Sequence, residues 1–108
     1  CEESRCVDLV YADSLNPVSA DDFRFSGSTN APSIVESYER SIRTVEELPC
    51  DMLLSPHPGF FGMQEKLSRQ AAGATDVFVN PNACRTYAGA ARTRLEQRIA
   101  QERARPSP

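Results

Sequence analysis

Only two short segments of the chain favour β-strand, and this small number most constrains the fold. Residues 7–12 (VDLVYA) and residues 51–55 (DMLLS) are apolar and are each bounded by turn-forming residues. Two strands do not form a stable sheet on their own. We therefore expect the chain to be the C-terminal part of a larger α/β domain.

Three helices are predicted around these strands. They cover residues 32–47, about 63–72 and about 83–103, and the first is expected to open at Pro32. Residues 18–31 form a long polar loop before the first helix. Each helix has an apolar face that must be buried against another part of the protein. In the last helix this face is predicted to comprise Ala83, Tyr87, Ala90, Ala91, Leu95 and Ile99.

The length of 108 residues suits one small domain or part of a larger one. The chain begins at Cys1 without an initiator methionine or a signal peptide, so we expect a processed or cut piece. Its apolar runs are all much shorter than the roughly 20 residues that a membrane span needs, which predicts no membrane association.

Charge is unevenly distributed along the chain. Residues 1–57 hold 11 acidic and 4 basic side chains, whereas residues 58–108 hold 4 acidic and 8 basic ones. Arginines in the last helix could form a phosphate-binding stripe. However, Glu96 and Glu102 interrupt the series, and no aromatic residues alternate with it. We therefore expect a solvated helix face, with basic residues favoured near the helix C-terminus, and no nucleic-acid binding.

The four cysteines are consistent with a zinc site, a redox pair or two disulfides. The spacing of Cys1 and Cys6 differs from the Cys-x-x-Cys redox motif, and Cys50 and Cys84 are isolated. An even number of cysteines in a small domain favours disulfides and an oxidising compartment. Of the three possible pairings, local ring closure favours Cys1–Cys6, which leaves Cys50–Cys84.

Candidate chemistry is found where each predicted strand ends. His57, the only histidine, lies in the rigid Ser55-Pro56-His57-Pro58-Gly59 frame after the second strand. It could be a structural histidine, a metal ligand or a general base. Ser14 follows the first strand, but no nucleophile-elbow motif surrounds it, so it is either a turn residue or a polar wall of a site shared with His57.

Three segments resemble the third subclass of metallo-β-lactamases in order and in spacing. They are residues 10–15 (VYADSL), residues 48–59 (LPCDMLLSPHPG) and residues 83–88 (ACRTYA). The match extends over nearly the whole chain but corresponds only to the C-terminal portion of that family's domain. The resemblance implies that residues 1–108 are part of an αββα sandwich. Its His-x-His-x-Asp-His motif lies upstream and is absent from this sequence.

The resemblance also assigns roles to individual residues. It implies a site for two zinc ions, with His57 as a ligand of the second ion. Ser14 corresponds to a serine that holds a water on that ion and contacts the substrate carboxylate. Asn16 stands where the family usually has Ser or Thr for the same carboxylate. Cys50 and Cys84 correspond to the subclass's common disulfide, and Cys1–Cys6 to the additional disulfide of one secreted branch.

The implied activity is zinc-dependent hydrolysis of the β-lactam amide of penicillins, cephalosporins and carbapenems, in which zinc activates water and polarises the carbonyl. The implied partners are the β-lactam substrate and the N-terminal segment of the same enzyme, in a periplasmic or secreted protein. The segment alone is expected to be inactive. Two other hypotheses are a small secreted disulfide-bonded module that binds a partner through residues 18–31, and another metallo-hydrolase such as a thioesterase-like enzyme. The paired cysteines argue against the latter.

Overall fold

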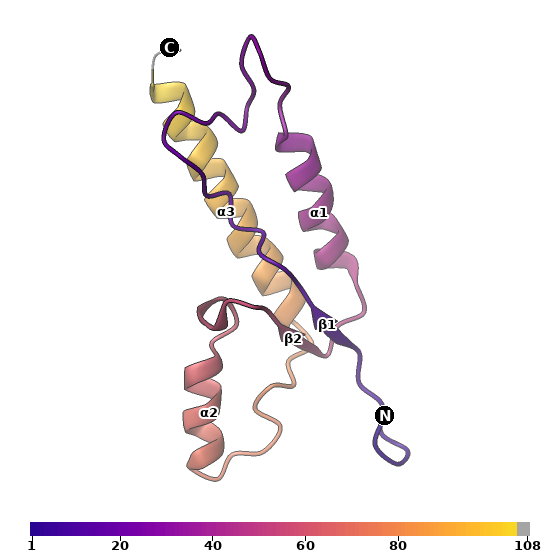
Figure 1. The fold of residues 1–108 in the computed structure, drawn as a ribbon. Helices are drawn as coiled ribbons and strands as arrows, with labels where there is room; N and C mark the ends of the chain where they lie inside the picture. The colour runs from indigo at the N-terminus through magenta and orange to yellow at the C-terminus, as the bar shows by residue number, and fades with distance from the viewer. Residues whose placement is uncertain (106–108) are drawn as a thin grey trace.

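The computed structural model describes residues 1–105 and has an extended shape (Figure 1). Its elements follow in the order β1 (Leu9–Tyr11), α1 (Val35–Glu47), β2 (Met52–Leu54), the 3-10 helix η1 (Pro58–Phe60), α2 (Met63–Ala71) and α3 (Ala83–Ala104). The molecule measures 57 × 26 × 17 Å, and its radius of gyration is 17.2 Å. A self-contained domain of this length has a radius of gyration of about 13 Å. The chain is therefore much less compact than an independent domain.

The two strands pair in parallel and form a two-stranded sheet, with Val10 opposite Leu53. Both strands are shorter than the predicted segments of residues 7–12 and 51–55. Pairing continues slightly beyond β1, because the Ala12 amide donates to the Leu54 carbonyl at 2.9 Å. On the opposite side of β2, Met52 forms an isolated antiparallel bridge with Val79.

One face of this sheet is left open at β1 within residues 1–105, whereas β2 is at least half-buried along its length. Val10 and Leu53 point towards the core, and Leu53 is buried. The neighbouring side chains of β1 are exposed, Leu9 at 55% and Tyr11 at 68% of their surface. Parallel sheets are normally covered on both faces. The exposed apolar face thus has the character of an internal surface, which agrees with the predicted α/β segment of a two-sheet sandwich.

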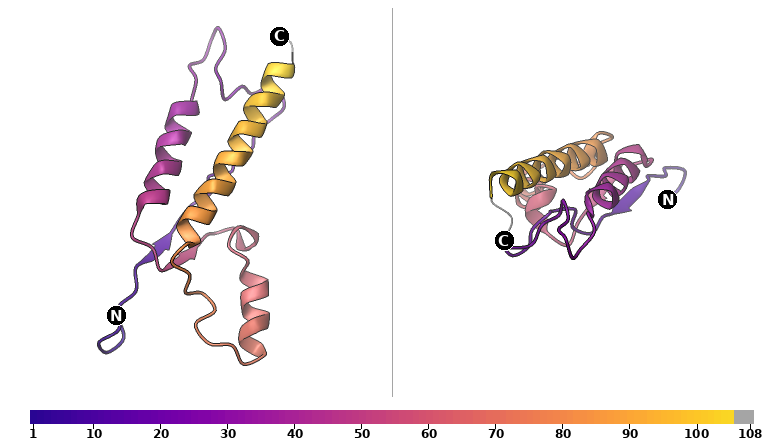
Figure 2. Two further views of the ribbon diagram at one scale, coloured as in Figure 1. Left: turned by 180° about the vertical axis from the view of Figure 1, so that it is seen from behind. Right: turned by 90° about the horizontal axis from the view of Figure 1, so that it is seen from above.

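Helices α1 and α3 lie side by side and run in opposite directions, as both side views show (Figures 1 and 2). Ile42 of α1 packs with Ala88, Ala91 and Leu95 of α3 in one buried cluster. The predicted inner face of α3 was wrong at Ala90, which is exposed, while Ala88 is fully buried. Within residues 1–105, no helix combines the length and the apolar character that crossing a membrane requires.

Helix α1 begins at Val35, three residues later than predicted, and Pro32 lies outside it. The preceding backbone is instead held by the loop: the Ile34 amide and the Ser33 hydroxyl both donate to the Phe25 carbonyl, at 2.9 and 3.3 Å. The Ser33 hydroxyl also accepts the Val35 amide at 3.3 Å. Because these loop contacts satisfy the backbone and keep it out of helical geometry, the helix starts only after them.

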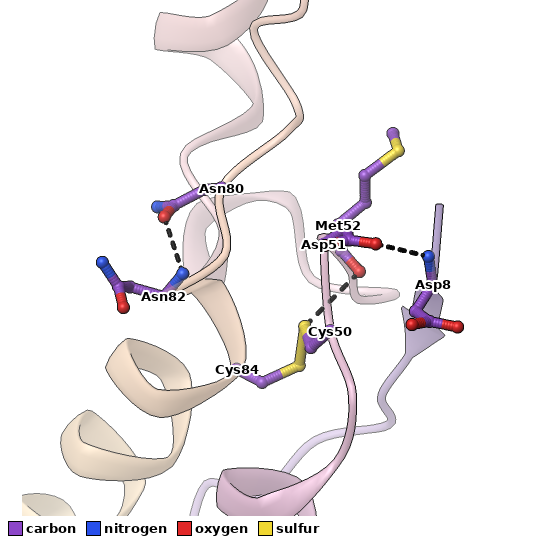
Figure 3. Close-up of a disulfide and its surroundings, with 7 residues drawn as sticks. All are labelled: Asp8, Cys50, Asp51, Met52, Asn80, Asn82 and Cys84. Atoms are coloured by element: carbon purple, nitrogen blue, oxygen red, sulfur yellow. Dashed lines mark hydrogen bonds between the residues drawn. A yellow bond between two sulfur atoms is a disulfide. The ribbon is translucent and has the colours of Figure 1, made fainter. Parts of the chain in front are cut away.

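Both predicted disulfides are present, Cys1–Cys6 and Cys50–Cys84. Figure 3 shows that the second joins Cys50, two residues before β2, to the first turn of α3. Beside it, the Asp51 carboxylate accepts the Asp8 amide at 2.8 Å, so the starts of both strands are tied together (Figure 3). The disulfide and this hydrogen bond connect β1, β2 and α3 at one end of the sheet.

Candidate metal and substrate site

The two segments with candidate chemistry leave the sheet at the same edge. β1 and β2 are parallel, so residues 13–16 and residues 55–59 both follow the carboxyl ends of their strands. Ligands of open α/β sheets bind at this edge. The topology therefore brings together the two segments that hold Ser14, Asn16 and His57.

Ser14 forms a local Ser turn shortly after β1, in which side chains bond to neighbouring amides. Its amide donates to the Asp13 carboxylate at 2.7 Å, and its hydroxyl accepts the Asn16 amide at 3.2 Å. The turn-residue interpretation is thus correct as local structure. Within residues 1–105 this hydroxyl donates no hydrogen bond, so its proton is available to donate to a bound group.

Tyr87 of α3 bonds the backbone on both sides of Ser14, a role that the sequence did not reveal. Its hydroxyl donates to the Asp13 carbonyl at 2.8 Å and accepts the Leu15 amide at 3.3 Å. The apolar pattern of the last helix predicts Tyr87 on its inner face and does not indicate a partner for its hydroxyl. A tyrosine at a buried position usually has a polar partner, and this was the available signal.

His57 is exposed and lies directly before η1. Its amide donates to the hydroxyl of buried Ser55 at 3.4 Å, and its carbonyl accepts the Phe60 amide at 3.0 Å. The imidazole packs edge-to-face on the Phe60 ring, with 5.3 Å between centroids. The backbone on both sides is therefore fixed while the ring nitrogens stay accessible, as a ligand or a proton-transfer group requires and a core histidine does not.

Residues 1–105 do not by themselves hold a metal ion. No group of three or more His, Cys, Asp or Glu side chains in this part of the chain is arranged as a metal site. Zinc sites of enzymes use three or more protein ligands. His57 therefore fits zinc only as one donor of a site that other residues complete.

The arginines near the end of the chain form only part of the solvated face that the sequence predicted: Arg103 and Arg105 are exposed, whereas Arg92, Arg94 and Arg98 are half-buried. Arg92 pairs with Glu46 of α1 at 2.6 Å, which lowers the pKa of the Glu46 carboxyl. The Arg94 guanidinium lies over the Phe60 ring, 4.9 Å from its centroid. Arg98 donates to the carbonyls of Ala20 and Phe23 at 2.9 and 2.7 Å. These three arginines connect α3 to other segments of the chain.

A buried carboxylate, Glu102, fastens the long loop to the C-terminal part of α3. Only 3% of this residue is exposed. Its two oxygens accept the amides of Phe25 and Ser26, at 2.6 and 3.0 Å, and the Ser26 hydroxyl at 2.7 Å. Arg98 adds an ion pair at 3.3 Å. Burial would raise the pKa of the Glu102 carboxyl, but these hydrogen bonds outweigh it, so the pKa lies below its ordinary value.

Comparison with known proteins gives a consistent result, although no family model matches the sequence. The Rm3 metallo-β-lactamase is 45% identical and superposes with a TM-score of 0.88 over 95% of this chain. SMB-1, a metallo-β-lactamase solved with mercaptoacetic acid, is 41% identical with a TM-score of 0.83 over 94% of the chain. MEM-A1, a subclass B3 metallo-β-lactamase from a soil metagenome library, is 41% identical with a TM-score of 0.81 over 91%.

In both sequence and fold, the chain therefore matches part of a metallo-β-lactamase. MEM-A1 is a subclass B3 enzyme, so the resemblance to the third subclass that the three sequence segments predicted is confirmed. The chain spans about 38% of the length of the Rm3 and SMB-1 enzymes, which is consistent with the predicted C-terminal segment.

Proposed function

We propose that the chain is the C-terminal portion of a zinc-dependent β-lactamase, which hydrolyses the ring amide of penicillins, cephalosporins and carbapenems. The observation that carries this proposal is the placement of residues 13–16 and 55–59 at one edge of a parallel sheet, in a chain 45% identical to a metallo-β-lactamase. Residues 1–108 would then belong to a single domain whose other zinc ligands lie in the N-terminal segment.

In this proposal, His57 is one ligand of the second of two zinc ions. Bound zinc supplies an activated water and an electrophile for the ring carbonyl. The contribution of this chain is to hold one imidazole in place: the Ser55 hydroxyl and the η1 turn fix the His57 backbone, and Phe60 supports its ring. A metal-activated water makes a protein nucleophile unnecessary, so Ser14 is not assigned that role.

Ser14 and Asn16 are proposed to bind the carboxylate that β-lactam antibiotics bear. The Ser14 hydroxyl has a proton to donate, and the Asn16 side chain offers an amide donor at the position where the family has a hydroxyl. Hydrogen bonds from these side chains to a charged carboxylate are stronger than neutral ones. They would orient the substrate rather than take part in bond cleavage.

The uncovered sheet face is evidence that another segment packs on it, and we propose that this segment is the N-terminal part of the same enzyme. Leu9 and Tyr11 present apolar surface that a second sheet would cover. The two disulfides favour a periplasmic or secreted enzyme, since such bonds persist in oxidising compartments. The alternative of a binding module that uses residues 18–31 gains no support, because Glu102 and Arg98 hold that loop against α3.

The test is hydrolysis by the complete enzyme that contains residues 1–108, measured with one penicillin, one cephalosporin and one carbapenem. We expect loss of absorbance from the lactam ring, abolition by a zinc chelator and recovery on adding zinc. A purified, zinc-replete enzyme that hydrolyses a thioester but none of these lactams would contradict the proposal. An Asn16→Ala variant should raise KM for substrates that bear the carboxylate more than it lowers kcat.

A further inference from the structure

We infer that Tyr87 is a positioning residue for the candidate site, with its hydroxyl setting the place of Ser14 and its ring supporting the segment that holds His57. This inference rests on the proposed function, because it assumes that Ser14 binds substrate. Tyr87 is buried, and the family resemblance assigns it no role.

The hydroxyl of Tyr87 bonds the residues on both sides of Ser14. It donates to the Asp13 carbonyl at 2.8 Å and accepts the Leu15 amide at 3.3 Å. The other hydrogen bonds at this point, from Ser14 to Asp13 and from Asn16 to Ser14, lie within the turn itself. They shape the turn, whereas Tyr87 joins it to α3 and so fixes where the Ser14 hydroxyl stands relative to the sheet.

The ring of Tyr87 reaches the second segment through Phe60. Tyr87 is 3% exposed, and its ring contacts that of Phe60 edge-to-face with 6.4 Å between centroids. Phe60 in turn packs on the His57 imidazole at 5.3 Å. A single side chain thus supports the segments that follow both strands.

The part of α3 that contains Tyr87 is itself fixed to the sheet. Cys84, one helical turn earlier, is bonded to Cys50 just before β2. This part of α3 is therefore held covalently at the start of one strand and bonded by Tyr87 at the end of the other. A positioning residue must itself be held in place, because a mobile side chain could not fix the position of Ser14.

The experiment compares Tyr87→Phe with Tyr38→Phe in the complete enzyme. The first removes the hydroxyl and keeps the ring. The second is a matched control, because the Tyr38 ring packs edge-to-face on Phe25 and its hydroxyl makes no hydrogen bond within residues 1–105. For Tyr87→Phe we expect amide hydrogen exchange at Leu15 to accelerate about tenfold or more. KM for a penicillin should rise about threefold to tenfold, with a smaller change in kcat and zinc content unchanged. The control should show none of these changes.

A double-mutant cycle that combines Tyr87→Phe with Ser14→Ala shows whether Tyr87 acts through Ser14. If it does, Tyr87→Phe adds little to KM once the Ser14 hydroxyl is gone. Fully additive effects, or unchanged Leu15 exchange in Tyr87→Phe, would overturn the inference and leave Tyr87 as a packing residue. If Ser14→Ala leaves KM unchanged while Leu15 exchange accelerates in Tyr87→Phe, the placement by Tyr87 is supported and the substrate role proposed for Ser14 is the part that fails.

Discussion

Replacing Glu102 by glutamine should destabilise the enzyme although the side chain keeps its size. Both carboxylate oxygens accept hydrogen bonds, one from the Phe25 amide and Arg98, the other from the amide and hydroxyl of Ser26. A glutamine presents an NH₂ group in place of one of these oxygens. The less costly orientation puts this NH₂ towards Ser26, because the Ser26 hydroxyl can rotate and accept from it.

The magnitude follows from what this orientation leaves unpaired. The Ser26 amide loses its acceptor, and an unsatisfied donor of this kind costs about 1–3 kcal/mol. Arg98 exchanges a charged acceptor for a neutral one, which removes about 1 kcal/mol more. We therefore expect Glu102→Gln to lower the free energy of unfolding by about 2–4 kcal/mol, a large part of the total of about 5–15 kcal/mol for an ordinary domain.

The assay is urea denaturation of the complete enzyme, followed by circular dichroism at a fixed zinc concentration. Glu96→Gln is the matched control, because Glu96 is an exposed residue of the same helix. It should change the free energy of unfolding by about 0.5 kcal/mol or less. If the two variants differ by less than that amount, Glu102 does not hold the loop and our account of residues 20–26 is wrong.

Three further predictions concern pH, backbone conformation and the isolated chain. Folding lowers the pKa of the Glu102 carboxyl, so the stabilisation from this carboxylate is present above its ordinary pKa of 4.5 and is lost as the pH falls below that value. In urea melts at successive pH values below 4.5, the wild type should therefore lose stability more steeply than Glu102→Gln. Gly27 has φ +90°, and a Cβ at this position would lie 2.8 Å from the Ser33 nitrogen, so Gly27→Ala should lower the free energy of unfolding by about 1–3 kcal/mol. Gly89 lies within α3 and has open space around it, so Gly89→Ala should raise that free energy by about 0.5–1 kcal/mol. Equal effects of the two variants in thermal melts would contradict this prediction. Purified residues 1–108 alone should hydrolyse no chromogenic cephalosporin, because one histidine cannot hold a catalytic zinc site, and zinc-dependent turnover would refute this.

Local sequence signals predicted the elements but located their ends less well. Within residues 1–105, apolar periodicity identified the three α-helices and β-forming runs identified the two strands, whereas the 3-10 helix η1 was not predicted. The start of α1 was misplaced because the carbonyl of Phe25, in the preceding loop, accepts the Ile34 amide and the Ser33 hydroxyl. That contact depends on how the loop folds back, which no local pattern encodes.

The supports of the candidate site were missed for a related reason. Tyr87 bonds residues more than 70 positions away, and Glu102 bonds loop residues at a similar separation. From sequence, Glu102 was an interruption in a basic helix face, and Arg98 was one of its solvated charges. Their tertiary partners reversed both interpretations: the carboxylate is buried because loop amides satisfy it, and the guanidinium is held by loop carbonyls. The motif residues His57, Ser14 and Asn16 could be proposed early because strand ends and family spacing are both visible in the sequence.

His57 is proposed to contribute a zinc ligand, and metal analysis of the complete enzyme tests this proposal. We expect two zinc ions per molecule in the wild type, a fall towards one in His57→Ala, and two in Ser14→Ala, which loses only a hydrogen bond of about 0.5–1.5 kcal/mol. Turnover should fall strongly in the first variant and mildly in the second. If His57→Ala keeps both zinc ions and near-normal turnover, His57 is a structural histidine and the proposed site is wrong.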